Sequence, residues 1–262
     1  MEKNKRDWKQ VRNAFVMVCV AVAMLSTATY AWFTLTNQPS LTGMELTAGT
    51  TSGLQISLNG SEWNSTVALP SGEKTLVPVS PAGTGAAFGK PIYAGNKVTG
   101  LETLTDDVAT ASYLAKYKFF LKAVGDGTVK VCLLGGTGSD ATGSFVKRKE
   151  AGSSTLAAAN TIRIGFKTTS DWKTFEPNTD AHNTGGKKAD TTMTEAAGDF
   201  CEKTDGTFTD TSSKTSRTVF TITGGNSLEI DMYVWIEGTD QDCVDEIQTD
   251  KLIGQLQFTV AE

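Results

Sequence analysis

A stretch without charge near the start of the chain constrains its fold more than any other feature. Residues 13–44 contain no Asp, Glu, Lys or Arg, and residues 14–25 form an uninterrupted apolar run. At about 1.5 Å per residue, a helix over residues 14–33 would be about 30 Å long, which matches the hydrocarbon core of a bilayer. The residues before it carry five basic and two acidic side chains. The positive-inside rule therefore places the rest of the chain outside the membrane.

Two interpretations of this segment remain open. A secretory signal peptide has a basic start, a short apolar run and small residues before the cleavage point, and cleavage after Ala28 or Ala31 fits that rule. An uncleaved membrane anchor would place Tyr30 and Trp32 at the outer interface. A buried core helix is disfavoured because the run is apolar on every side and not only on one stripe. We favour export followed by cleavage, and assign residues 1–31 to a signal peptide or transmembrane anchor.

The remaining chain, residues 32–262, shows the period-two alternation of β-strands. In residues 115–122 every second side chain is apolar, and three of the other four are lysines, which is typical of a half-buried strand. Several such segments separated by polar turns predict an all-β fold, a jelly-roll-like β-sandwich in a single domain. The other expected strands are residues 44–48, 54–58, 128–134, 161–168, 218–223, 228–236 and 252–260.

Glycine-rich segments are expected to connect these strands. Gly125-Asp126-Gly127 predicts a hairpin turn that pairs residues 115–122 with residues 128–134. Gly224-Gly225-Asn226 predicts another turn, and residues 44–48 are expected to pair with residues 54–58. Residues 78–100 and 169–215 are rich in Gly, Pro or polar side chains and predict two long loops.

Two parts of the sequence resemble a known family. An apolar segment that ends in Thr29-Tyr30-Ala31-Trp32-Phe33 follows a basic start and precedes a polar, Thr-rich strand. In these features the chain resembles exported proteins of the TasA–camelysin type, which are biofilm-fibre and surface proteins of Gram-positive bacteria. The block VWIEGTDQDC at residues 234–243 also resembles an element of related clostridial surface proteins.

The resemblance implies a jelly-roll-like fold, processing by a dedicated signal peptidase and at least a transient stay in the membrane. It also implies donor-strand complementation, in which an N-terminal segment, here residues 32–48, completes the sheet of another copy or of a related fibre subunit. An added strand satisfies the backbone groups of an open edge, and a contact that does not close builds a filament. The long middle loop and the cysteines depart from the fibre-forming pattern, so a minor subunit or a monomeric surface protein remains open. The donor-strand candidates are Trp32, Phe33, Leu35, Leu41, Met44 and Leu46.

Acidic residues are concentrated near the C-terminal end of the sequence. Glu237, Asp240, Asp242 and Asp245 lie within nine residues, and carboxylates at this density could hold Ca²⁺ outside the cell. The spacing is not that of an EF-hand loop, since no glycine follows at the required position. The alternative is a solvated acidic turn that leads into a short helix over residues 242–248. Ca²⁺ is the one cofactor that the sequence suggests.

The chain has four cysteines, and Cys19 lies within the apolar segment. Export favours disulfides, and Cys201 and Cys243, both in polar surroundings, are the candidates for a bridge. Cys132 lies on an expected strand and is expected to be a buried thiol. Fully reduced cysteines and a covalent link between subunits remain as alternatives.

Several classes of function are disfavoured. The single histidine, His182, lies in a polar run, so a zinc site built on several histidines is excluded. No nucleophile–base pattern or phosphate-binding loop is evident, and we expect a protein that is not an enzyme. The net charge of −5 without a basic run in the body argues against nucleic acid as a partner.

Two non-enzymatic functions are left. The leading hypothesis is an exported structural protein of the cell surface that assembles into an extracellular fibre or decorates one. The alternative is a membrane-anchored adhesin or glycan-binding module, since Trp63, Trp172 and Trp235 could form a surface on which sugar rings stack.

Overall fold

The structure is a computed structural model in which two compact units are distinguished, Met1–Gln38 and Pro39–Glu262. It describes residue 17 and residues 38–48, 53–70, 72–82, 87–94, 97–133, 144–149, 158–175, 201–203, 207–209, 218–240, 243 and 247–260. Apart from residue 17, the predicted export segment, including Ala28 and Ala31, lies outside the described residues. In the part of the chain that is described, no helix combines the length and the hydropathy of a membrane span.

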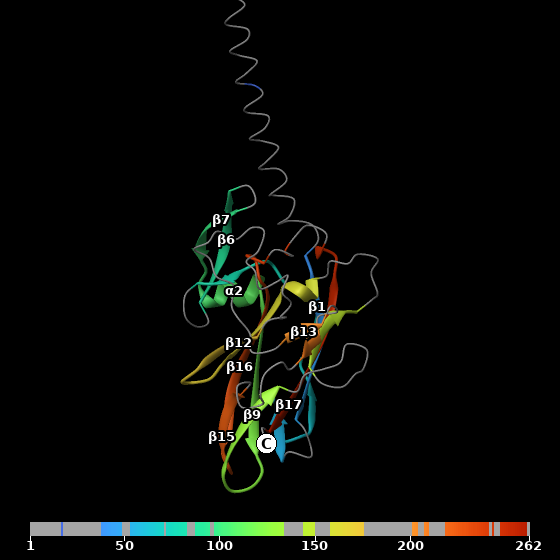
Figure 1. Ribbon diagram of the computed structural model, residues 1–262, viewed down its shortest axis with the longest axis vertical. Helices are drawn as coiled ribbons and strands as arrows, with labels where there is room; N and C mark the ends of the chain where they lie inside the picture. Colours follow the sequence, from blue (N-terminus) through green and yellow to red (C-terminus); the bar gives the residue numbers. More distant parts are fainter. Residues whose placement is uncertain are drawn as a thin grey trace, which may run out of the picture. The chain divides into compact units, whose positions relative to one another are not determined.

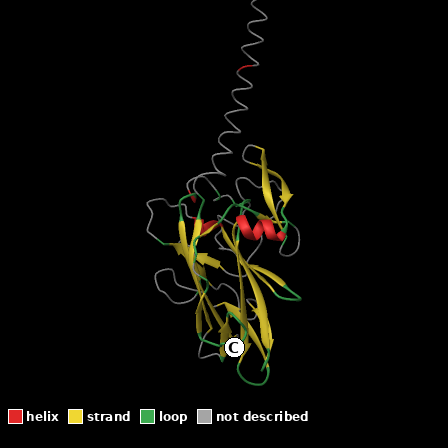
Figure 2. Ribbon diagram, turned by 180° about the vertical axis from the view of Figure 1, so that it is seen from behind, coloured by secondary structure: helices red, strands yellow, loops and turns green. Residues whose placement is uncertain are grey.

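Strands dominate the described residues and form three sheets (Figures 1 and 2). The predicted all-β class is confirmed. In the nine-stranded sheet, strands follow the order β13-β14-β10-β17-β1-β3, with β4 beside β1 and the pair β9-β15 beside β17. Its strands are β1 (Ser40–Ala48), β3 (Thr66–Ala68), β4 (Lys74–Thr75), β9 (Thr128–Leu133), β10 (Phe145–Arg148), β13 (Cys201–Lys203), β14 (Thr207–Thr209), β15 (Thr218–Thr223) and β17 (Lys251–Val260).

The five-stranded sheet has the order β12-β11-β16-β8-β2. A short 3₁₀ helix, η2 (Ala158–Thr161), leads into β11. The strands of this sheet are β2 (Leu54–Ser57), β8 (Ala115–Ala123), β11 (Ile162–Lys167), β12 (Trp172–Phe175) and β16 (Ser227–Ile236).

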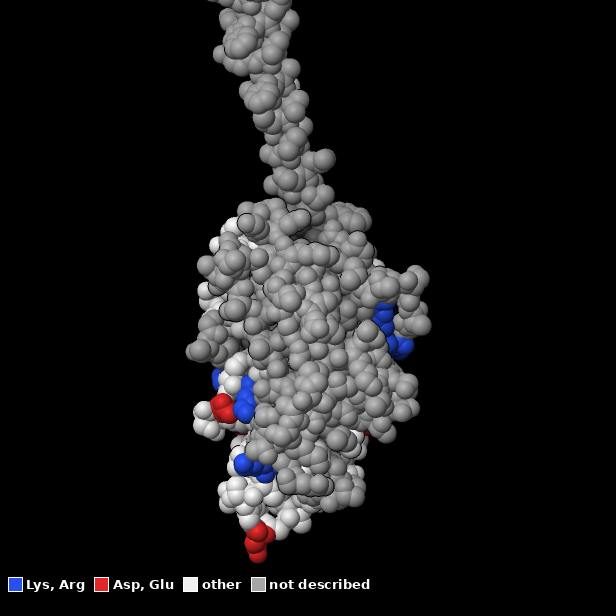
Figure 3. All heavy atoms as spheres, viewed as in Figure 1, with Lys and Arg blue, Asp and Glu red and all other residues white. Residues whose placement is uncertain are grey.

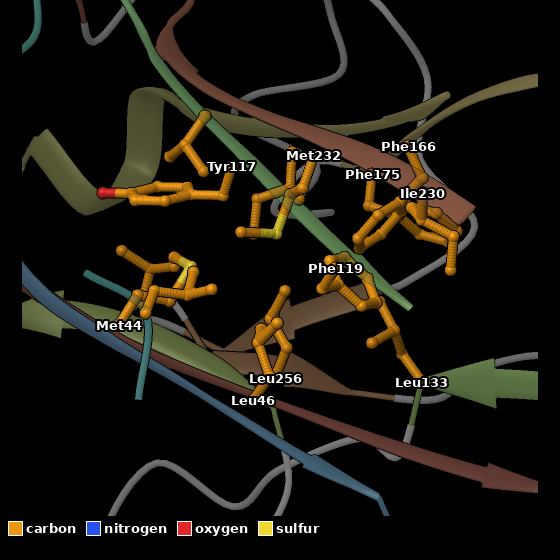
Figure 4. Packing of buried hydrophobic residues seen from close by; sticks show 14 of the residues in the cluster. Met44, Leu46, Tyr117, Phe119, Leu133, Phe166, Phe175, Ile230, Met232 and Leu256 are labelled. Atoms are coloured by element: carbon orange, nitrogen blue, oxygen red, sulfur yellow. The ribbon is translucent and has the colours of Figure 1, made fainter. Parts of the chain in front are cut away.

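The nine- and five-stranded sheets share one hydrophobic core. Alternate residues of β8 are buried, as the sequence pattern predicts. Phe119 of β8 lies 5.6 Å from Phe258 of β17, and Phe166 of β11 lies 5.4 Å from Phe220 of β15, measured between ring centroids. Figure 4 shows side chains of the two sheets facing one another across this core, among them Met44, Leu46 and Leu256 on one side and Tyr117, Phe119 and Met232 on the other.

Strand β17 has different partners on its two sides. On one side β1 runs parallel to it, from Ser40 opposite Lys251 to Ala48 opposite Phe258. On the other side β10 pairs with the first half of β17 and β9 with its end, both antiparallel. Between these two partners the Ser144 hydroxyl accepts a hydrogen bond of 3.0 Å from the N–H of Gln257. A side chain thus replaces a backbone partner where the neighbouring strand changes.

The glycine turns at residues 125–127 and 224–226 do not close hairpins. Strand β8 pairs with β16 and β2, whereas β9 pairs with β15 and β17. A two-stranded ribbon therefore passes from the five-stranded to the nine-stranded sheet: β8 continues into β9, and β15 continues into β16. Both strands of the ribbon bend at four glycines, which we call the glycine corner: Gly125, Gly127, Gly224 and Gly225. Three of them have positive φ, and a Cβ on Gly224 would lie 2.1 Å from the carbonyl oxygen of Gly125. The predicted hairpin is wrong because a bend between sheets needs the same glycines as a tight turn.

Two other expectations also differ from the structure. Strands β1 and β2, expected to pair, belong to different sheets. Residues 78–100, expected to be a long loop, contain most of a three-stranded sheet made of β5 (Ser80–Pro81), β6 (Phe88–Ala94) and β7 (Lys97–Thr103), which helix α2 (Asp106–Ser112) follows. Within the second expected loop, β12, β13 and β14 are described, and most of the remaining residues lie outside the described part.

The three-stranded sheet packs against the outer face of the five-stranded sheet. Phe88 of β6 lies 5.1 Å from Trp235 and 6.0 Å from Tyr233 of β16, between ring centroids. Val79 and α2 residue Ala109 belong to the same buried cluster. The outward-facing aromatic residues at the end of β16 are therefore covered, which creates a second, smaller core.

Candidate functional site

The strongest concentration of buried polar groups follows β16, at residues 237–240, which we call the acidic turn. Glu237 is 1 % exposed. Its Oε2 accepts a hydrogen bond of 3.1 Å from the indole N–H of Trp235, and its Oε1 accepts one of 2.8 Å from the Thr239 hydroxyl. The hydroxyl of Ser80 in β5 also donates to Oε1. This carboxylate thus links the three-stranded sheet to the end of β16.

The second carboxylate of the acidic turn is paired with a buried arginine. The Asp240 Oδ2 lies 2.8 Å from Nη2 of Arg163, and both side chains are completely buried. Arg163 is in β11, opposite Trp235 of β16, and its Nη1 also donates to the carbonyl oxygen of Ile162 at 3.0 Å. The ion pair therefore joins β11 to the chain that leaves β16.

These contacts bear on the calcium prediction. Both Glu237 and Asp240 are buried and accept hydrogen bonds from protein groups, so the predicted solvated acidic turn is wrong for these two residues. Asp242 and Asp245 lie outside the described residues. Within the described part of the chain, no three His, Cys, Asp or Glu side chains are arranged to hold a metal ion.

Sequence reasoning missed Arg163 and the burial of the acidic turn. Arg163 stands between Ile162 and Ile164 on a strand whose next alternate position, Gly165, has no side chain. The pattern predicted the strand itself, with its alternate apolar residues on one face. The signal that could have shown otherwise is weak: a single basic residue among apolar ones, and tryptophan and acidic residues adjacent at the end of another strand.

The cysteine predictions have different outcomes. Cys132 is buried on β9, as expected, and its thiol lies 3.6 Å from the carbonyl oxygen of Thr259. Cys243 is buried just after the acidic turn. The side chain of Cys201 lies outside the described residues, so the bridge between Cys201 and Cys243 stays a prediction.

The donor-strand candidates divide into two groups. Leu41, Met44 and Leu46 lie in β1, are buried, and face the core of their own chain. Their strand pairs with β17 on one side and with β3 and β4 on the other. The position that these residues fill is thus a central strand of the sheet to which they are covalently connected. Trp32, Phe33 and Leu35 lie outside the described residues.

The three tryptophans proposed for stacking sugars do not form one surface. Trp235 is completely buried. Trp172 stacks on Trp235 at 6.3 Å between centroids and lies over Gly165, where an added Cβ would come within 2.4 Å of its ring. Trp63 lies elsewhere, with its ring 5.5 Å from the Lys122 ammonium. Two of the three tryptophans therefore hold the second core together.

Charged residues line the exposed part of the outer face of the five-stranded sheet. Lys116 lies 3.5 Å from Asp231, and Lys118 pairs with Glu229. On the face seen in Figure 3, the described basic and acidic side chains are scattered and do not gather into a patch of one charge. Pairs of this kind at an exposed surface contribute little to stability.

Lys116 also contacts Tyr233, with its ammonium 4.9 Å from the centre of the tyrosine ring. Burial alone would lower the pKa of Lys116, but its polar interaction with Tyr233 and the charges of Asp231 and Asp106 raise it above the ordinary value. Burial raises the pKa of Tyr233, against the opposing effect of Lys116. Both groups are therefore held in their protonated forms.

Strands β12 and β15 both contact Phe166, an aromatic residue of the core. Strand β12 is the last of the five-stranded sheet, and β15 pairs only with β9 among the described strands. Phe166 contacts both Phe175 of β12 and Phe220 of β15, at 5.5 and 5.4 Å between centroids. Phe166 thus connects the last strand of the five-stranded sheet with β15 inside the core.

Comparisons with protein-family models, with curated proteins and with solved structures found no match to this chain. His182, the only histidine, lies outside the described residues. The buried charged groups all have partners within the protein: Asp240 pairs with Arg163, and Glu237 accepts hydrogen bonds from Trp235 and Thr239. Their arrangement connects the sheets with one another.

Proposed function

We propose that the protein is an exported, extracytoplasmic structural protein of the cell surface that assembles into an extracellular fibre or decorates one. The observation that carries the proposal is a β-sandwich in which β15 pairs with β9 alone among the described strands, preceded in the same chain by a predicted export segment. Open edges present unpaired backbone N–H and C=O groups, which favour the addition of a strand from another molecule. The resemblance to TasA–camelysin proteins belongs to this proposal.

A jelly-roll-like topology is the finer part of the fold proposal. In a jelly roll, antiparallel strand pairs wrap around the sandwich from one sheet to the other. The ribbon that bends at the glycine corner supports this topology, since β8–β16 and β9–β15 are successive parts of one such pair. The parallel pairing of β1 with β17 is an addition to an otherwise antiparallel plan.

N-terminal sequencing of the protein recovered from the cell surface tests export and processing. We expect a chain that begins at Thr29 or Trp32, after removal of the segment by a signal peptidase. A chain that still begins at Met1 and fractionates with membranes would contradict cleavage and would support the anchored form.

Electron microscopy of the processed protein tests assembly. We expect filaments whose formation depends on protein concentration. Particles of one subunit under all conditions would contradict the fibre hypothesis. Deletion of residues 32–48 is unsuitable for this test, because Leu41, Met44 and Leu46 are part of the protein's own core.

A further inference from the structure

The loop between β2 and β3, residues 58–65, contains the one Asn-Gly pair of the sequence, Asn59-Gly60. Asn59 is exposed, and Gly60 lies beside the ring of Phe120 with a φ of +73°. A backbone nitrogen attacks the side-chain carbonyl carbon of the preceding asparagine most readily when it belongs to glycine, because glycine has no side chain to block the approach. At this pair the chain can therefore modify itself.

The carbonyl oxygen of the Asn59 side chain is surrounded by hydrogen-bond donors. Its Oδ1 accepts bonds of 2.9 Å from the backbone N–H groups of Ser61 and Glu62, 2.9 Å from the Ser61 hydroxyl and 3.0 Å from the Ser57 hydroxyl. In an unfolded chain, water would supply these donors and would have to reorient as negative charge developed on the oxygen. Here the donors are in place before the reaction, which is the arrangement that stabilises an oxyanion.

The Ser57 hydroxyl also connects this carbonyl group to the attacking nitrogen. The N–H of Gly60 donates to the Ser57 Oγ at 2.9 Å, and the Ser57 hydroxyl in turn donates to the Asn59 Oδ1. Ser57 is completely buried, so its hydroxyl is held between the two groups. This one hydroxyl can take the proton of the nitrogen during the attack and give its own proton to the carbonyl oxygen.

We propose that Asn59 is a self-modification site, at which the Gly60 nitrogen displaces the side-chain amide as ammonia. A bond forms between the Gly60 nitrogen and the Asn59 Cγ, and a proton passes from that nitrogen through Ser57 to Oδ1. The bond between Cγ and Nδ2 then breaks, and the proton on Oδ1 moves to the departing nitrogen. The products are ammonia and a cyclic imide, which water opens to aspartate or isoaspartate.

The reaction changes the surface of the loop. The Asn59 Nδ2 donates a hydrogen bond of 3.3 Å to the Glu62 carboxylate, whereas an aspartate at this position places two carboxylates side by side, and these repel one another. Isoaspartate also adds an atom to the backbone. Copies that have reacted therefore differ from new copies in charge and shape beside Phe120. The inference is independent of fibre assembly, so its failure would leave the proposed function intact.

Mass spectrometry of peptides from the freshly purified protein, incubated at mildly alkaline pH, follows the exchange of the amide NH₂ for OH. We expect Asn59 to react at least about tenfold faster in the folded protein than in the same protein unfolded in guanidinium chloride, because the donors are in place only in the fold. Asn64 is the internal control. It is exposed in the same loop and precedes Ser65, and it should not react faster in the folded protein.

Two variants separate this mechanism from simple flexibility of the loop. Ser57→Ala removes the hydroxyl between nitrogen and carbonyl, and we expect the reaction in the folded protein to slow about 100-fold. Ser61→Ala removes one donor to Oδ1 and should slow the reaction about tenfold, less than in an enzyme because the site is exposed to water. Both variants should leave the rate in the unfolded chain unchanged. Ser65→Ala, at an exposed serine of the same loop, is the matched control and should change neither rate.

The opposite results overturn the inference. A reaction that is equally fast or slower in the folded wild type would show that the hydrogen bonds protect Asn59. Unchanged or faster reactions in folded Ser57→Ala and Ser61→Ala would show that these hydroxyls take no part in the chemistry. Circular dichroism checks that each variant is folded. Ser61 is exposed, so Ser61→Ala decides the outcome if Ser57→Ala does not fold.

Discussion

Strand β16 begins at the glycine corner and ends at the acidic turn, and the two ends redirect the chain by different means. At the corner, the neighbouring backbone approaches Gly224 closely, and Gly225 has a positive φ. At the acidic turn, Glu237 and Asp240 are buried and accept hydrogen bonds from side chains of three strands, β5, β11 and β16. The glycine corner depends on the absence of side-chain atoms, and the acidic turn depends on the pairing of buried charges. In the sequence, both look like ordinary polar turns.

The largest effect is expected from breaking the ion pair at the acidic turn. Asp240→Ala leaves the Arg163 guanidinium buried without this carboxylate, and we expect the free energy of unfolding to fall by about 3–5 kcal/mol. Denaturant titration measures the change. The control is Glu229→Ala, which removes an exposed ion pair and should cost less than about 1 kcal/mol. Equal losses in the two variants would show that the buried pair has no special role.

The next largest effect is expected from Glu237, the other buried carboxylate of the acidic turn. Glu237→Ala removes the acceptor of the Trp235 indole N–H and of the Ser80 and Thr239 hydroxyls, and we expect a loss of about 2–3 kcal/mol. The tryptophan fluorescence spectrum should change with it, because the Trp235 indole loses its partner. Glu237→Gln, which keeps the shape and an acceptor oxygen, should lose less. An unchanged spectrum in Glu237→Ala would contradict the link.

The corner is expected to be sensitive to a single added methyl group. In Gly224→Ala the new Cβ would meet the Gly125 oxygen at 2.1 Å and the Gly127 nitrogen at 2.7 Å, and we expect a loss of about 1–3 kcal/mol from the forced backbone shift. Gly43→Ala is the control, since a Cβ there meets nothing within 4 Å. Its change should stay within about 0.5 kcal/mol. Similar thermal unfolding of both variants would show that the corner tolerates side chains.

The smallest effect lies on β16 between the two ends and depends on pH. The raised pKa of Tyr233 and Lys116 means that the folded state holds these protons more tightly than the unfolded state does. This contribution to stability is complete below about pH 10, where the unfolded groups are still protonated, and is lost as the pH rises further. Tyr233→Phe should weaken the decline above pH 10. A decline of the same steepness in the variant would assign it to other groups, such as Tyr117, whose pKa burial also raises.

Strand positions could be read from the sequence far better than strand partners. The expected strand at residues 218–223 has the bounds of β15, and the expected strand at residues 228–236 differs from β16 by one residue. Alternation of apolar side chains is a local property, and it shows in the sequence. Pairing depends on contacts between distant segments, so the sequence around Gly125 is compatible with both a hairpin and a bend between sheets.

The candidate site was harder to predict for the same reason. Acidic residues near β16 were recognised, but their burial depends on Ser80 and Arg163, which are separated from them by 157 and 77 positions in the chain. The short three-stranded sheet that packs on the outer face of the five-stranded sheet is built from Gly- and Pro-rich sequence, which resembles that of a surface loop.

The position of β17 also determines when the body can fold. Strand β17 is the last described strand in chain order, yet β1, β9 and β10 all pair with it. Synthesis from the N-terminal end delivers β1 first and its parallel partner last. Until β17 emerges, β1 is without the longest of its strand partners and the nine-stranded sheet is without its central strand. Prematurely terminated chains therefore leave open edges exposed and are targets for proteolysis.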